Sequence, residues 1–152
     1  MRGRFLLLLS LSAGLLVQLL SAAGPGDQRP GAEINRVLKA QAQAWNRGDI
    51  DGYMAGYARA ATTQFVSADT VTRGWETVRD RYKAKYDSRE KMGALSFSDI
   101  KITELSADSA MAVGRWRLKR KNDQPHGRFT LLLRKLPEGW RIVHDHTSSA
   151  ER

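Results

Sequence analysis

The second half of the chain alternates between apolar and polar residues with the period of two that β-strands show. Two such runs within residues 127–149 flank the Pro/Gly turn Leu136–Gly139, which predicts an antiparallel hairpin. Two further long strands are predicted over about residues 95–105 and 110–121, with polar turn residues after each. Together these runs predict a meander of four long antiparallel strands.

The first half of the chain has the helical period instead. Apolar residues recur at three- and four-residue spacing in three segments, which predicts helices over about residues 33–47, 50–57 and 75–86. Two short strands are predicted between the second and third helices, at residues 64–67 and 70–73. Helices that precede a run of antiparallel strands predict an α+β fold in which the sheet covers the helices on one face.

Residues 1–23 have the pattern of a secretory signal peptide. Met1 to Arg4 form a positively charged segment, Phe5 to Val17 form an apolar run without charge, and Ser21 to Ala23 are small residues suited to cleavage. The apolar run is short for a membrane span, and an uncleaved anchor is the alternative. We therefore expect export to the periplasm or the exterior, with no stable membrane anchor after cleavage.

The mature chain is expected to hold one domain. Residues 24–32 are rich in Pro and Gly and are interpreted as a flexible leader. Residues 33–149 contain neither repeats nor a second linker, and their length suits a single core. The chain has no cysteine, which excludes disulfides, thiol nucleophiles and cysteine metal ligands.

The formal net charge of +9 favours anionic surfaces or ligands. The basic residues are nevertheless spread along the chain, with one dense cluster at residues 117–121, and no zinc-finger or RNA-recognition signature occurs. We interpret them as a solvated basic face and expect no nucleic-acid partner. Glycine-rich phosphate loops and nucleophile-elbow motifs are also missing, and we expect no cofactor.

The last predicted strand carries the candidate chemistry. If the strand is regular, one of its faces passes from core to polar residues, in the order Trp140, Ile142, His144, His146 and Ser148. Two histidines on one face can bind a metal if a third ligand converges, can hydrogen-bond a ligand, or can simply be polar residues at a strand end. We expect hydrogen bonding and no metal site. Asp145 then faces away, toward an Arg on a neighbouring strand, unless a bulge turns it inward.

Three segments resemble the nuclear transport factor 2-like superfamily, which includes ketosteroid isomerases and SnoaL-like polyketide cyclases. They are Ala44–Asp49, Phe65–Ser67 with Arg73–Trp75, and Trp140–Ser148. The chain is most similar to small bacterial SnoaL-like domains of undefined function, over residues 33–149. The resemblance implies a cone-shaped, strongly curved antiparallel sheet wrapped around three helices.

The resemblance also implies a cavity at the open end of the cone. Trp140 and Ile142 would fill its narrow part, while His144, His146 and Ser148 would approach the mouth. Aromatic residues would line the remaining walls, namely Trp45, Tyr53, Tyr57, Tyr82 and Trp116. The convex face of the sheet would pair two subunits into a homodimer through an apolar patch formed by Val113, Leu132 and Val143.

The residues that ketosteroid isomerases use are missing from the matching positions. Ser67 stands where the base carboxylate is expected, residues 114–116 contain no acid, and Ala42 and Trp45 stand where a tyrosine is needed. Three hypotheses remain. The first is an exported domain that binds a small-molecule ligand in an aromatic-lined cavity. The second is a cofactor-independent cyclase, isomerase or hydrolase with His146 as general acid/base, and the third is a dimerising association module.

Overall fold

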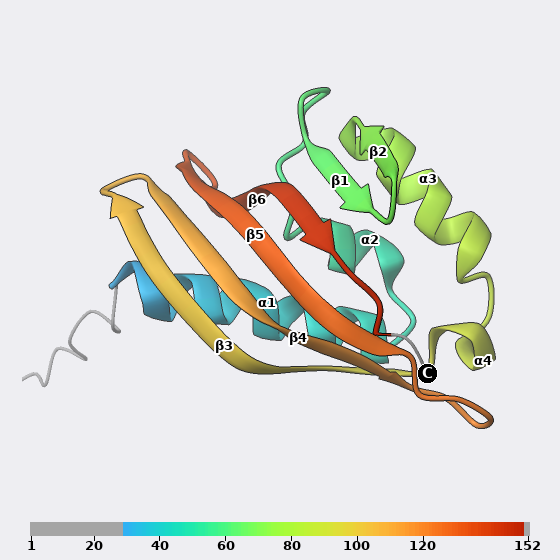
Figure 1. Cartoon of the computed structure of the whole chain (residues 1–152). Helices are drawn as coiled ribbons and strands as arrows, with labels where there is room; N and C mark the ends of the chain where they lie inside the picture. Colours follow the sequence, from blue (N-terminus) through green and yellow to red (C-terminus); the bar gives the residue numbers. More distant parts are fainter. Residues whose placement is uncertain (1–28, 151–152) are drawn as a thin grey trace, which may run out of the picture.

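A six-stranded, strongly curved sheet wraps one face around the longest helix (Figure 1). The computed structural model describes residues 29–150. The predicted signal peptide, residues 1–23, and most of the predicted leader lie outside the described residues. The helices are α1 (Pro30–Asn46), α2 (Ile50–Met54), α3 (Trp75–Lys85) and α4 (Arg89–Met92). The strands are β1 (Gln64–Ser67), β2 (Thr70–Arg73), β3 (Ala94–Ser106), β4 (Ser109–Lys119), β5 (His126–Leu136) and β6 (Gly139–Thr147).

The α+β class and the curved sheet predicted from the sequence are confirmed, with three differences in detail. Helix α1 begins at Pro30, inside the predicted leader, because proline suits the first turn of a helix. A single extra turn, α4, follows the three predicted helices and is capped by Ser88, which accepts a hydrogen bond from the Lys91 amide.

The third difference is that the sheet is mixed. Its strand order is β2-β1-β6-β5-β4-β3, and β1 runs parallel to β6 while every other neighbouring pair is antiparallel. On one side, β1 forms an antiparallel hairpin with β2. On its other side, β1 pairs with β6, the last strand of the chain. Parallel partners need a long connection, and here it contains α3 and the three strands β3–β5.

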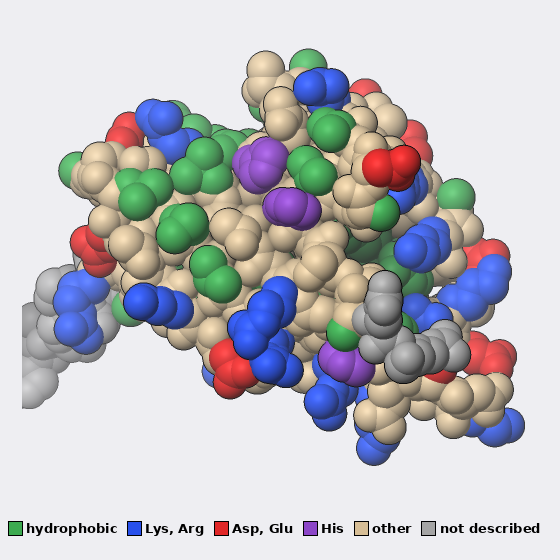
Figure 2. Space-filling model, in the orientation of Figure 1, with side chains coloured by type: hydrophobic (Ala, Val, Ile, Leu, Met, Phe, Trp, Pro, Cys, Tyr) green, Lys and Arg blue, Asp and Glu red, His purple; other side chains and the backbone are tan. Residues whose placement is uncertain are grey.

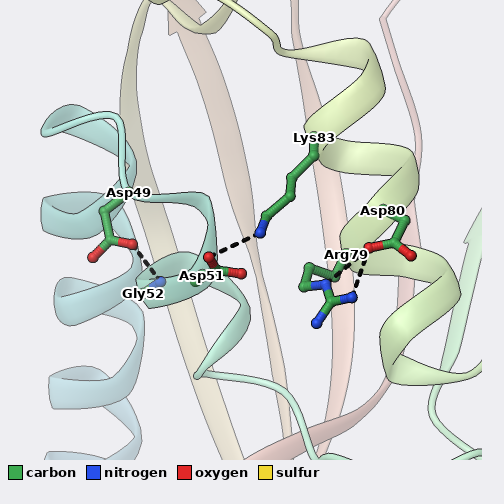
Figure 3. A network of polar contacts seen from close by, with 6 residues as sticks. All are labelled: Asp49, Asp51, Gly52, Arg79, Asp80 and Lys83. Carbon is green, nitrogen blue, oxygen red and sulfur yellow. Dashed lines mark hydrogen bonds and ion pairs between the residues drawn. The ribbon is translucent and has the colours of Figure 1, made fainter.

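Hydrogen bonds at the ends of elements fix the helices within the curve of the sheet. The Asn46 side chain donates to the Leu95 carbonyl at 3.0 Å and accepts from the Leu95 amide at 2.7 Å, which joins the end of α1 to β3. The Trp75 indole donates to the Met54 carbonyl at 2.9 Å, which joins α3 to α2. Asp49 caps α2 by accepting a bond of 2.7 Å from the Gly52 amide (Figure 3).

No helix within residues 29–150 is long and apolar enough to cross a membrane.

A bulge in β6 decides which residues face the helices. Leu133 of β5 pairs with Ile142 and the preceding Leu132 pairs with His144, so Val143 is an extra residue with no partner. One extra residue reverses the alternation of side chains beyond it. Before the bulge, Ile142 is 1% exposed. After it, Asp145 is the buried residue, 3% exposed, and His146 lies at the surface.

The predicted position of His144 and His146 beside the core is therefore wrong. Both histidines lie beyond the bulge and face the outer, convex side of the sheet, where Leu132, the partner of His144, is 36% exposed. The His144 Nδ1 atom lies 3.3 Å from the side-chain oxygen of Gln64 on β1. Figure 2 shows histidine and hydrophobic side chains gathered on this outer face of the sheet.

Candidate functional site

A cavity of about 130 Å³ lies between the concave face of the sheet and helices α1–α3. The structure brings the predicted aromatic residues together around it, which are Trp45, Tyr53, Tyr57, Tyr82 and Trp116. It adds aromatic residues that the sequence analysis missed, namely Phe65, Tyr86, Phe97 and Phe129. The aromatic lining is therefore a feature of the structure, and a ligand-binding role for these residues stays a prediction.

Contacts between rings hold the helical wall of the cavity in shape. The Trp45 ring centroid lies 5.1 Å from that of Tyr53 and 4.7 Å from that of Tyr86, both edge to face. Tyr82 stacks on Tyr86 with centroids 5.7 Å apart. The Trp45 indole also donates to the Met92 carbonyl at 3.1 Å, so its orientation is fixed. Such pairs favour one arrangement of the rings, and the wall is thus largely preformed.

Asp145 is the buried acid of this cavity. The Tyr57 hydroxyl donates to its Oδ2 and the Thr147 hydroxyl donates to its Oδ1, each at 2.7 Å. Burial raises the pKa of Asp145 to about 6, although the hydrogen bonds from Thr147 and Tyr57 oppose the increase. Among the described residues, Asp145 makes no ion pair. Its carboxyl can therefore exchange a proton near neutral pH.

Tyrosine hydroxyls extend from this carboxyl along the cavity wall. Tyr57 uses its one hydroxyl proton in the bond to Asp145, so the contact of 3.4 Å between the Tyr53 and Tyr57 hydroxyls is donated by Tyr53. Burial raises the pKa of Tyr53, Tyr57 and Tyr82 above the usual range, with the charge of Asp145 as a further cause. These phenols therefore stay protonated and act as neutral donors.

The mouth of the cavity is more polar than its interior. Ser67, Thr147 and Ser149 line it on the sheet side, and the exposed residues Arg81 and Lys85 line it from α3. The cavity thus has an acid among aromatic rings inside and two basic side chains at the surface.

Three predicted site residues lie away from this cavity. His144 and His146 are on the opposite face of the sheet, so the expected position of His146 as a general acid/base at the cavity mouth is wrong. Ser148 extends the pairing of β6 with β5 instead: its amide donates to the Arg128 carbonyl, and its carbonyl accepts from the Trp116 indole at 2.9 Å. Its neighbour Ser149 lines the cavity.

Within residues 29–150, no three His, Asp or Glu side chains lie close enough together to hold a metal ion. The third histidine, His126, is on β5, and its ring nitrogen lies 3.0 Å from the Gln124 carbonyl. The two histidines of β6 therefore have no third ligand in this part of the chain.

Solved structures with the same fold include proteins without an assigned function. An NTF-2 like protein of unknown function from Shewanella oneidensis is 43% identical, with a TM-score of 0.77, over 79% of this chain and 99% of its own. A ketosteroid isomerase-like protein from Erwinia carotovora atroseptica is 20% identical, with a TM-score of 0.65, over 80% of this chain and 96% of its own. An NTF2-like protein with a cystatin-like fold from Novosphingobium aromaticivorans is 12% identical, with a TM-score of 0.66, over 80% and 82%.

At these identities, the second and third structures support the fold alone. No curated protein matches the chain. The family model of the SnoaL-like domain matches residues 34–151, which include every described strand and most of α1. The chain therefore belongs to the SnoaL-like domain family, within the nuclear transport factor 2-like fold.

Proposed function

We propose that the cavity binds a small, mainly aromatic molecule and that Asp145 and Tyr57 recognise one polar group on it. The observation that carries this proposal is a buried carboxyl among aromatic rings that makes no ion pair within the described chain. Burying a carboxyl costs free energy that hydrogen bonds offset only in part, and an apolar residue of similar volume is often at least as stabilising. A binding role explains why an acid lies there.

The size of the cavity supports a ligand with one ring. An engineered protein cavity of about 150 Å³ lined by apolar residues binds benzene. The present cavity, about 130 Å³, is slightly smaller but opens at its mouth, so substituents on a ring can extend outward. Its walls are aromatic, and edge-to-face contacts would add to the apolar burial of a ring.

Asp145 can pair with either kind of polar group. Each carboxylate oxygen accepts one hydrogen bond from the protein and retains a lone pair for another donor. The ionised carboxyl would accept a bond from a ligand hydroxyl, and the protonated carboxyl would donate to a ligand carbonyl. Because its pKa is raised to about 6, both forms are populated within the physiological range.

Phenol is a suitable probe, since it combines one ring with one hydroxyl. We expect phenol to shift the NMR signals of cavity residues in a saturable way, and to bind more weakly to Asp145→Asn, whose amide is a poorer acceptor. Ser67→Trp should abolish binding by filling the cavity. Val66→Trp is the matched control, because Val66 directly precedes Ser67 on β1 and faces the side of the sheet away from the cavity. Equal binding to both tryptophan variants would refute the proposal.

A second candidate function is proton transfer by Asp145. An acid with a pKa near the working pH is suited to general acid–base catalysis. In deuterium oxide, the protein should accelerate exchange of the α-protons of cyclohexanone. Exchange should fall to the background rate in Asp145→Asn and be retained in His146→Gln. Exchange at the uncatalysed rate in the wild-type protein would exclude this chemistry for simple ketones.

A further inference from the structure

We propose that the cavity selects organic anions, specifically single-ring aromatic carboxylates whose carboxylate lies at the mouth beside Lys85 and Arg81. This inference rests on the proposed binding function and adds the charge of the ligand and its orientation. It starts from the charged residues of the lining. Apart from Asp145, these are Arg81 and Lys85, both on α3 and both exposed.

The basic residues of α3 fall into two pairs with different surroundings. Lys83 and Arg79 are not among the residues that line the cavity, and each lies against a carboxylate (Figure 3). The Lys83 ammonium lies 2.9 Å from Asp51 Oδ2, and the Arg79 guanidinium lies 2.8 Å from Asp80 Oδ1. This outer pair therefore already has its counter-ions.

The inner pair has none within residues 29–150. The Arg81 guanidinium donates to the Thr72 hydroxyl at 2.7 Å, a neutral partner. The Lys85 ammonium lies 5.4 Å from the centroid of the Tyr86 ring, which is also neutral. Two positive charges at the edge of an apolar cavity attract an anion and hold it where water still reaches it.

The two ends of the cavity fix the orientation of such a ligand. A carboxylate placed inside would lose its hydration and lie beside the acid Asp145, and both effects are unfavourable. At the mouth the same carboxylate keeps part of its hydration and gains the attraction of Lys85 and Arg81. The ring then occupies the aromatic interior, where a cavity of about 130 Å³ suits a single ring.

Three probes of equal length separate the charge of the ligand from its ring. These are 3-phenylpropanoate, its neutral amide and the cationic 3-phenylpropylamine, each titrated into the full mature chain at pH 7.5 and followed by NMR. We expect the carboxylate to bind about fivefold more tightly than the amide, because exposed ion pairs contribute modestly. The amine should bind least well, and the advantage of the carboxylate should shrink as salt is added.

Paired variants of α3 assign the preference to the inner residues. The double variant Arg81→Gln/Lys85→Gln should bind the carboxylate and the amide equally. The control Arg79→Gln/Lys83→Gln changes the net charge by the same amount on the same helix, and it should keep the preference. A preference that survives in the inner variant, or that disappears in the outer one, overturns the assignment.

The failures of the two proposals can be told apart. If the carboxylate and the amide bind equally to the wild-type protein, or if the amine binds best, the selection for anions is wrong while the cavity remains a binding site. If none of the three probes binds, and phenol does not bind either, the binding function itself is wrong and the inference fails with it.

Discussion

The two faces of β6 differ in what the same short segment does on each side of the sheet. On the concave face, Asp145 is buried, receives two short hydrogen bonds and lines an aromatic cavity. On the convex face, His146 is exposed and His144 contacts Gln64 beside exposed Leu132. The two histidines predicted to carry the chemistry therefore lie outside, and the acid between them lies inside. A single bulge residue, Val143, separates these outcomes.

The largest expected difference between the faces is in stability. Trp140 is 1% exposed on the concave face, whereas Leu132 is 36% exposed on the convex face. Trp140→Ala should lower the free energy of unfolding by about 3–5 kcal/mol, because it leaves a cavity in the core. At a protein concentration low enough to keep the chains apart, Leu132→Ala should change it by about 0.5 kcal/mol or less, as surface substitutions do. Urea denaturation of both variants checks the contrast, and comparable losses would mean that the faces are assigned wrongly.

The next effect concerns pH. The folded pKa of Asp145 is raised from 3.8 to about 6, so the folded state binds this proton more tightly than the unfolded state. The protonated Asp145 carboxyl therefore stabilises the folded state at low pH. That contribution is lost as the pH rises from about 4 through about 6. Compared with Asp145→Asn, the wild-type protein should lose about 2 kcal/mol of unfolding free energy between pH 4 and pH 7. Parallel pH profiles of the two proteins would show that Asp145 is not buried as described.

The oligomeric state of the protein tests whether the convex face forms an interface, as the concave face forms a cavity. The homodimer expected from the family resemblance would place exposed Leu132 in an interface between two copies. Sedimentation equilibrium should then give twice the chain mass for the wild-type protein and a mass closer to one chain for Leu132→Glu, because the glutamate would bury a charge. Glu138→Lys in the β5–β6 turn serves as a control for a surface charge change. A wild-type protein of single-chain mass would end the dimer hypothesis.

The smallest effect is expected for His146. Because this residue is exposed on the face opposite the cavity, His146→Ala should leave the affinity for phenol unchanged and alter stability by about 0.5 kcal/mol or less. A large loss of phenol binding would mean that the histidine reaches the cavity after all.

Much of the fold could be predicted from the sequence because the hydrophobic periods are strong. The turn at Pro137–Gly139 and the alternation on both sides of it predict the β5–β6 hairpin, and the helical spacing near Trp75 predicts α3. The parallel pairing of β1 with β6 was missed, since it depends on a contact between segments far apart in the chain. No local pattern in β1 reports which strand will lie beside it.

The candidate site was predicted less well for a physical reason. Its aromatic residues Trp45, Tyr53, Tyr57, Tyr82 and Trp116 could be named because the family resemblance implies that they lie on the walls of a cone, and all five line the cavity. The inward position of Asp145 could not be predicted, because the bulge at Val143 has no marker such as glycine in the sequence. Without a bulge, the regular alternation of side chains along the strand puts the histidines on the inner face. An inward Asp145 requires a bulge in the last strand, and the structure contains one at Val143.

The central claim is that the bulge at Val143 points the Asp145 side chain into the aromatic-lined cavity. The most direct test is to follow the side-chain carboxyl carbon of Asp145 by NMR across the pH range, assigned with Asp145→Asn. A titration midpoint near 6 is the result that this structure predicts, with a shift in that midpoint when phenol is added. A midpoint near 3.8, unaffected by phenol, would contradict it, because that is the behaviour of an aspartate in water.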